Sequence, residues 1–142
     1  MKFTEIKQEE WASIQPYLDT CLLPLTGLLG NEPPWEVAAA LRNLRDLMDL
    51  VEIPFKGRIV TYPAMHYSVD SELFVAQVND LCKRMKVTTF KHIILISTDV
   101  SIQKLNFTEC DLFVGLSLIN LSNHVSEKVQ SIWSRNEVLG KQ

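Results

Sequence analysis

Short apolar runs alternate along this chain with longer stretches in which apolar residues recur every three or four positions. The runs are bounded by Asp, Gly, Pro and Ser, and they predict four strands, over residues 20–25, 58–63, 92–97 and 112–118. The third run holds three isoleucines between its polar ends. Such a continuous apolar segment is typical of a central strand that is covered on both faces.

The longer stretches predict helices over residues 8–15, 35–50, 71–85 and 123–138. A turn of helix near residues 101–105 would carry the chain from the third strand to the fourth. The apolar spacing defines the buried faces that we expect: Val37, Leu41, Leu44, Met48 and Val51 in the second helix, and Val125, Val129, Ile132 and Trp133 in the last. We expect Trp35, at the start of the second helix, to pack onto the sheet, as apolar residues at helix starts often do; an exposed tryptophan would instead indicate a partner contact.

This order of elements predicts an α/β fold. We expect one three-layer α/β/α domain over residues 1–142, built on a mostly parallel, four-stranded, doubly wound sheet of the Rossmann or flavodoxin type, with an extra N-terminal helix. The last strand could run either way, and we favour the parallel direction. A domain of this length buries roughly 68–70% of the surface of its unfolded chain, so it needs no disulfide or metal to fold.

Composition and charge narrow the classes of partner. The net charge is −3, and the basic residues cluster only at Lys83, Arg84, Lys86 and Lys91, where a helix end favours cations. Nucleic-acid binding is therefore not expected. No apolar stretch is long enough for membrane insertion, and the N-terminus lacks a signal-peptide pattern, so we expect a cytoplasmic protein.

Three distant cysteines without C-x-x-C spacing predict neither a disulfide framework nor a structural zinc site. We expect Cys21, in a strand, and Cys82, on an apolar helix face, to be buried thiols.

In open parallel sheets, ligands bind beyond the carboxyl ends of the strands. Asp19 and Asp111 precede strands, so we expect them at the opposite edge. The candidate binding edge comprises Thr26, Gly27 and Asn31 after the first strand, His66 and Tyr67 after the second, Asp99 after the third and His124 after the fourth.

Familiar phosphate-binding motifs are missing from this edge. The turn "PLTGLLGNEPPW" lacks G-x-G-x-x-G spacing, and its two prolines remove N–H donors that a phosphate would need. There is no P-loop, and Leu25 and Thr26 stand where a phosphoacceptor domain would need acidic residues. Thr26 alone would make a poor phosphate loop for a flavin. We therefore expect no cofactor.

Two classes of function stay open. The first is a non-enzymatic interaction or assembly protein, with a protein partner or as a homodimer. The alternative is a small-molecule-binding protein or hydrolase that uses His66 and Asp99, with or without His124, as a general base oriented by an acid. The same three groups could bind zinc or iron, but no H-x-H or H-E-x-x-H spacing supports a metal. A degenerate nucleotide sensor at the turn over residues 27–31 is a weaker third hypothesis.

Two segments resemble the YpiF-like family. They are "PYLDTCLLPLTGL" (16–28), with Tyr17, Asp19, Thr20 and Pro24, and "GRIVTYPAMHY" (57–67), with Tyr62, Pro63, His66 and Tyr67. The resemblance covers nearly the whole chain. It implies a small cytoplasmic bacterial protein of unassigned function, and it implies no catalytic residue, substrate or cofactor.

Overall fold

The computed structural model describes residues 1–116 and 122–140, with the side chains of the last helix described from residue 124 to residue 134. The elements in chain order are η1 (Phe3–Glu5), α1 (Gln8–Ile14), β1 (Thr20–Pro24), α2 (Pro34–Glu52), β2 (Ile59–Thr61), α3 (Ser71–Thr88), β3 (His92–Ile96), α4 (Val100–Gln103), β4 (Leu112–Val114) and α5 (Ser122–Gly140).

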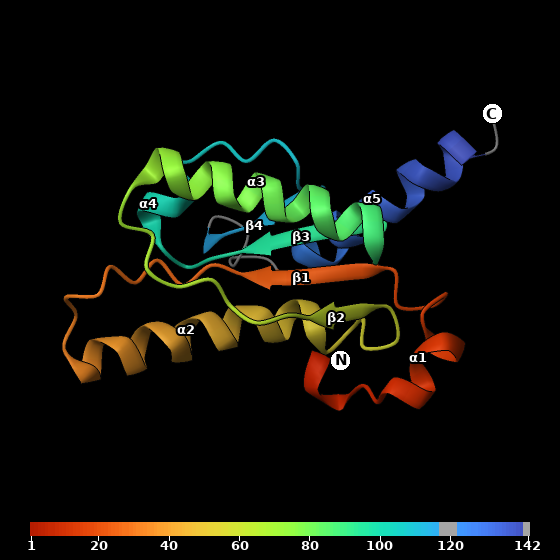
Figure 1. The fold of residues 1–142 in the computed structure, drawn as a ribbon, viewed down its shortest axis with the longest axis horizontal. Helices are drawn as coiled ribbons and strands as arrows, with labels where there is room; N and C mark the ends of the chain where they lie inside the picture. Colours follow the sequence, from red (N-terminus) through yellow and green to blue (C-terminus); the bar gives the residue numbers. More distant parts are fainter. Residues whose placement is uncertain (117–121, 141–142) are drawn as a thin grey trace.

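The four strands form one sheet in the order β2-β1-β3-β4, and every pairing is parallel. The chain therefore moves outward from β1 to β2 and then crosses back to β3, on the other side of β1 (Figure 1). This is the doubly wound arrangement, and its switch point lies between β1 and β3. The predicted α/β class and the parallel direction of the last strand are confirmed.

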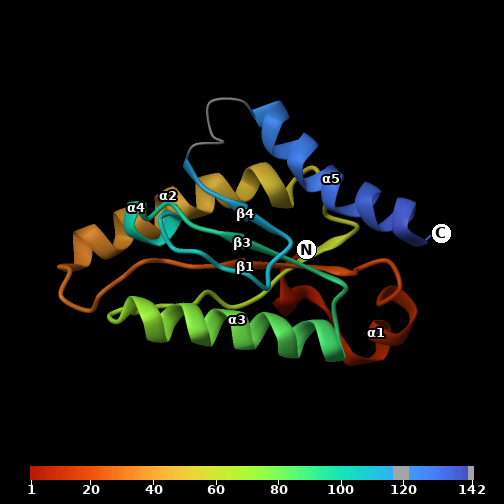
Figure 2. The ribbon, with the colours of Figure 1, turned by 90° about the horizontal axis from the view of Figure 1, so that it is seen from above.

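Helices cover both faces of the sheet, with α3 on one side and α2 and α5 on the other (Figure 2). Strand side chains alternate between the faces: Leu23 and Ile93 pack in the same core as Phe74 and Val78 of α3. In the second core, β-strand residues pack against α2 and the predicted inward residues of α5, namely Val125, Val129, Ile132 and Trp133. The three-layer arrangement is confirmed, and the single-domain organisation stays a prediction.

All four strands are shorter than predicted, β1 and β3 by one residue each and β2 and β4 by more. The structure ends β2 at Thr61: Tyr62 N–H still donates to the Leu22 carbonyl at 3.0 Å, but Pro24 of β1 has no N–H with which to continue this ladder. β4 ends at Val114, and residues 117 and 118 of its predicted range lie outside the described residues. Beyond the strands, one isolated bridge between Leu25 and Met65 still holds the β1 and β2 turns together.

The predicted inward face of α2 is partly wrong. Leu44, Leu47 and Val51 are buried, whereas Leu41 is 40% exposed. The reason is length: the 19 residues of α2 span about 28 Å, while the five residues of β1 span about 17 Å. The first half of α2 therefore extends past the carboxyl ends of the strands, as Figure 1 shows.

The N-terminal segment lies along the outer side of the edge strand β2. Lys2 forms a parallel bridge with Thr61, whose N–H donates to the carbonyl of Met1 at 2.8 Å. Within the described residues, no helix has the length and apolar character needed to cross a membrane.

Candidate functional site

Thr26 joins the turns that follow β1 and β2. Its side chain is buried, and Oγ1 lies 3.2 Å from the carbonyl of Met65 and 3.2 Å from Nδ1 of His66. Leu28 N–H also donates to this oxygen, at 3.4 Å. When the hydroxyl donates to Met65, Nδ1–H of His66 must donate to Thr26, and Nε2 is left as the acceptor. The predicted residues Thr26 and His66 are thus brought together.

The turn after β1 also contacts the loop after β3, where Gly27 packs against Asp99. Gly27 has a φ of +75°, and a Cβ added there would lie 2.4 Å from Cγ of Asp99. Asp99 in turn caps α4, because its Oδ1 accepts from Ile102 N–H at 2.9 Å. Its carbonyl accepts from the Gln103 side chain at 3.1 Å. These contacts give Asp99 a structural role: it caps α4 and fills the space beside Gly27.

The paired base and acid of the hydrolase hypothesis are not formed in this structure. Within the described part of the chain, no hydrogen bond or ion pair joins His66 to Asp99. His124 lies in the first turn of α5, which packs with α2 over one face of the sheet. No three His, Cys, Asp or Glu side chains of the described residues are placed to hold a metal ion.

The remaining predicted residues lie on the exposed loops. Asn31 is exposed, and the neighbouring carboxylate of Glu32 accepts from the N–H groups of Leu29 at 2.8 Å and Gly30 at 2.9 Å. These hydrogen bonds, above all that from Leu29, lower the pKa of Glu32. Tyr67 is exposed and has a φ of +60°, a backbone conformation that costs a non-glycine residue roughly 1–2 kcal/mol.

A cavity of about 180 Å³ opens beside Gly27 and Asp99. Its polar groups are the Asp99 carboxylate and three serine residues, and its apolar walls come from both neighbouring loops: Ser68, Ser71 and Ser101, with Leu29, Val69, Ile102 and Leu105. Within the described residues, only Oδ1 of Asp99 accepts a hydrogen bond, so Oδ2 is available to a ligand.

Exposed apolar side chains gather at the end of the molecule where the strands end, and we call the set the carboxyl-end surface; Leu29 and Val69 of this set line the cavity. The surface comprises Leu29, Trp35, Tyr67, Val69, Leu73 and Val100, all of which follow the carboxyl end of a strand or begin the next helix. Val69 is 75% exposed and Trp35 is 72% exposed. The expectation that Trp35 packs onto the sheet is therefore wrong, because the start of α2 lies beyond the sheet.

The same end of the molecule is acidic. Residues 25–37, 62–74 and 97–104 contain five carboxylates and one lysine: Glu32, Glu36, Asp70, Glu72 and Asp99, against Lys104. Sequence reasoning named Asp99 and missed this surface. The available signal was the run of apolar residues in predicted loops, where a solvated loop would normally be polar.

At the opposite edge, the structure places a polar network that sequence reasoning did not assemble. Asp19 accepts from Arg58 at 3.1 and 3.2 Å, and the Arg58 guanidinium lies 4.1 Å from the centre of the Trp133 ring. Asp111 pairs with Lys86 at 3.1 Å. Asp19 and Asp111 lie at the amino ends of the strands, as expected. The network ties helices to the sheet.

The thiols offer no nucleophile. Cys21 and Cys82 are buried, as predicted. Desolvation raises the pKa of Cys21 and raises that of Cys82 to about 12. Burial also raises the pKa of Cys110. A thiolate is the reactive form of cysteine, so burial disfavours the reactive form of all three thiols.

Proteins similar to this chain have no assigned function. The uncharacterized protein YpiF of Bacillus subtilis (strain 168) is 26% identical over 102 residues, which make up 71% of this chain and 68% of that protein. No solved structure matches the chain. A family model described as "Protein of unknown function (DUF2487)" matches residues 9–138. The chain therefore belongs to the DUF2487 family.

Proposed function

We propose that this chain is a non-enzymatic interaction domain, and that its carboxyl-end surface binds a partner protein which presents a basic, partly apolar segment. The observation that carries the proposal is the set of exposed apolar side chains at the carboxyl end of the sheet, two of which, Leu29 and Val69, line a cavity that also holds the Asp99 carboxylate. The cytoplasmic location expected from the sequence stays part of the proposal.

Apolar exposure supplies the driving force for binding. Single exposed apolar residues are normal on a protein surface, but a contiguous group rimmed by polar residues is typical of an interaction site. Tyr67 and Trp35 are residue types that dominate binding energy when a partner covers them. The left-handed backbone of Tyr67 keeps its ring on the surface at a cost in stability.

Charge indicates what kind of partner fits. A lysine or arginine side chain could place its aliphatic stem between Leu29 and Val69 and its charged head near Oδ2 of Asp99. An anion is disfavoured there, because carboxylates already cap both nearby helix starts: Asp70 accepts from Leu73 N–H at 3.0 Å, and Asp99 caps α4.

The small-molecule or hydrolase alternative has less support. It requires an oriented base, and His66 contacts Thr26 rather than a carboxylate in the described structure.

Site-specific photo-crosslinking tests the proposal directly. A photoreactive amino acid replaces Val69 in one variant and Val87, which is 85% exposed near the far end of α3, in a matched control. In native cells we expect one discrete adduct from position 69 and none from position 87. The double substitution Glu36→Lys and Glu72→Lys should weaken that adduct, whereas Glu9→Lys with Glu10→Lys, which changes the same charge on α1, should not.

The crosslinking results distinguish a partner protein from a homodimer and from a general effect of net charge. No adduct at position 69, or the same adducts at both positions, would contradict the proposal. An adduct of twice the chain mass would assign this surface to a homodimer instead. Loss of the adduct with both double substitutions would show that net charge, rather than this surface, governs the contact.

A further inference from the structure

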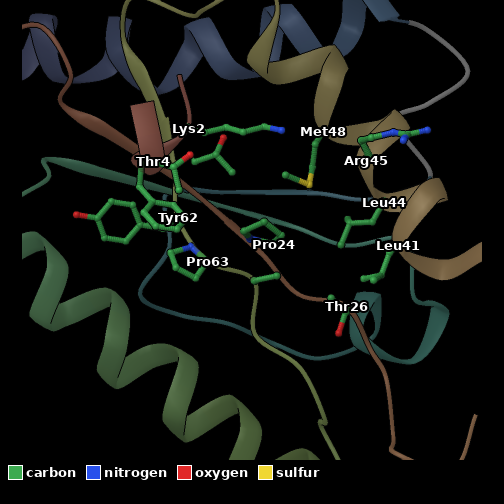
Figure 3. A pocket seen from close by; sticks show the side chains of 13 residues that line it. Lys2, Thr4, Pro24, Thr26, Leu41, Leu44, Arg45, Met48, Tyr62 and Pro63 are labelled. Carbon is green, nitrogen blue, oxygen red and sulfur yellow. The ribbon is translucent and has the colours of Figure 1, made fainter. Parts of the chain in front are cut away.

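A second cavity, of about 320 Å³, lies between α2 and the N-terminal segment at the edge of β2. Its volume is in the range of small-molecule sites, which are usually mostly apolar. In Figure 3, Leu41, Leu44 and Met48 of α2 point toward Pro24 at the end of β1. This cavity shares no residue with the carboxyl-end surface, so a ligand bound in the cavity would be distinct from the proposed partner protein.

The charged side chains around this cavity are cations. Lys2 and Arg45 line it, and none of the described residues that line it is a carboxylate. Lys2 extends along one side of the opening in Figure 3. Arg45 pairs only with Asp46, at 3.5 Å between two exposed side chains, an interaction that contributes little. In Figure 3 the Arg45 guanidinium points away from the cavity, so this exposed side chain must turn to contact a bound anion, whereas Lys2 already lies along the opening.

Three further carboxylates belong to a different hollow. Glu5, Asp49 and Glu52 line a neighbouring hollow that shares Lys2 with the cavity. Glu52 is buried and accepts from the Thr61 hydroxyl at 2.5 Å. That hollow also holds Lys56 and the amino group of Met1, so its carboxylates face cations of their own, and the apolar cavity is lined by cations alone among the charged residues that the structure describes.

The apolar space continues beyond the cavity. A further hollow of about 450 Å³ is lined by Ile6, Trp11 and Val60. It shares Phe3, Tyr62 and Pro63 with the cavity between α2 and the N-terminal segment. The rings of Phe3 and Tyr62 lie edge to face, with centroids 6.2 Å apart, and form the wall between the two. Phe3 is partly exposed, so a rotation of its ring would lengthen the space available to an apolar chain.

We propose that the cavity between α2 and the N-terminal segment binds a small carboxylate that carries an apolar chain. The chain lies against Leu41, Leu44 and Met48, where it loses contact with water. The carboxylate lies at the opening, within reach of Lys2 and Arg45, where it keeps part of its hydration. A neutral apolar ligand would gain the apolar contacts and lack the attraction to the cations.

Methyl NMR on the full-length protein, titrated with octanoate, 1-octanol and octylamine, tests this inference. Octanoate should shift the methyl signals of Leu41, Leu44 and Met48 saturably, and 1-octanol and octylamine should bind at least about fivefold more weakly. Lys2→Glu should raise the octanoate Kd about fivefold, whereas Lys7→Glu, a control that lies outside the cavity lining, should leave it unchanged.

A cavity-filling variant gives an independent check. Leu41→Trp places a large ring in the partly exposed rim of the cavity and should abolish octanoate binding, while Leu73→Trp on the distant start of α3 should not. Equal binding of the three probes, binding that survives Leu41→Trp, or no saturable shift would overturn the proposal. Flotation with phosphatidylglycerol vesicles in the absence of any octanoate response would overturn it in favour of a membrane surface.

Discussion

Gly27 illustrates how one residue positions the edge where the strands end. Its left-handed backbone turns the chain directly after β1, and its missing side chain leaves the space that Asp99 occupies. Thr26, one residue earlier, holds His66 of the neighbouring turn. Two consecutive residues therefore fix the relative placement of the loops after β1, β2 and β3, and with them the cavity and the carboxyl-end surface.

Gly27→Ala should lower the free energy of unfolding by about 2–4 kcal/mol, since it adds left-handed strain and an overlap with Asp99. Urea denaturation followed by circular dichroism measures the loss. Gly57→Ala is the matched control, because a Cβ there meets no atom within 4 Å; we expect a change within about 0.5 kcal/mol. Similar losses in both variants would contradict the close packing of Asp99 on Gly27.

At the scale of the element, α5 depends on one aromatic residue near the amino ends of the strands. Trp133 donates from Nε1 to Oγ1 of Thr20 at 2.8 Å, and its ring lies edge to face with Phe55 at 5.2 Å. Arg58 covers the ring. Aliphatic residues earlier in the helix supply burial, whereas Trp133 adds a directional bond that sets how α5 lies on the sheet.

Trp133→Phe should lower the free energy of unfolding by about 1–3 kcal/mol, because it keeps an aromatic ring but removes the hydrogen bond to buried Thr20 and reduces the ring area. Trp35→Phe, at an exposed position, should change it by less than about 0.5 kcal/mol. Far-UV circular dichroism during urea denaturation measures both without relying on tryptophan fluorescence. Equal effects would show that Trp133 does not anchor α5.

At the scale of the whole molecule, the two ends of the sheet have different tasks. The amino end carries the charged network that connects strands with α3 and α5, and the carboxyl end carries the exposed apolar surface. His92 lies buried within the network, near Asp19, Arg58, Asp111 and Lys86. Desolvation, reinforced by the two cations and opposed by the two carboxylates, lowers the pKa of His92.

Stability should therefore fall as the pH is lowered through the range of histidine titration. The unfolded chain takes up a proton on His92 near pH 6.5, whereas the folded chain resists it. The contribution of neutral His92 is complete above about pH 6.5 and is lost as the pH falls toward the lower folded pKa. Urea denaturation at pH 7.5 and pH 6.0 should show the loss in the parent protein and in His66→Gln. If His92→Gln loses as much stability between these two pH values as the parent protein, groups other than His92 cause the loss.

Periodicity along the chain was enough to predict the order of strands and helices, the parallel sheet and the buried face of α5, because a helix or strand side chain faces the core according to its own spacing. Asp19 and Asp111 were also placed correctly, because a residue that comes just before a parallel strand lies at the amino-end edge of the sheet. The contacts of His66 and Asp99 could not be predicted in the same way. Both lie at the expected edge, yet their neighbours depend on the path of separate loops across the β1 turn.

The chain's local patterns thus specified which segments form the layers and which end of the sheet carries the long loops. The tertiary structure alone decided that Trp35 is exposed and that Leu41 lies partly exposed at the rim of a cavity, because this requires the length of α2 relative to the strands that it covers. It also decided that Lys2 and Tyr62, 60 positions apart in the sequence, line one cavity. Such contacts arise from the lateral order of the strands and the packing of the N-terminal segment on β2, and residue spacing along the chain contains neither.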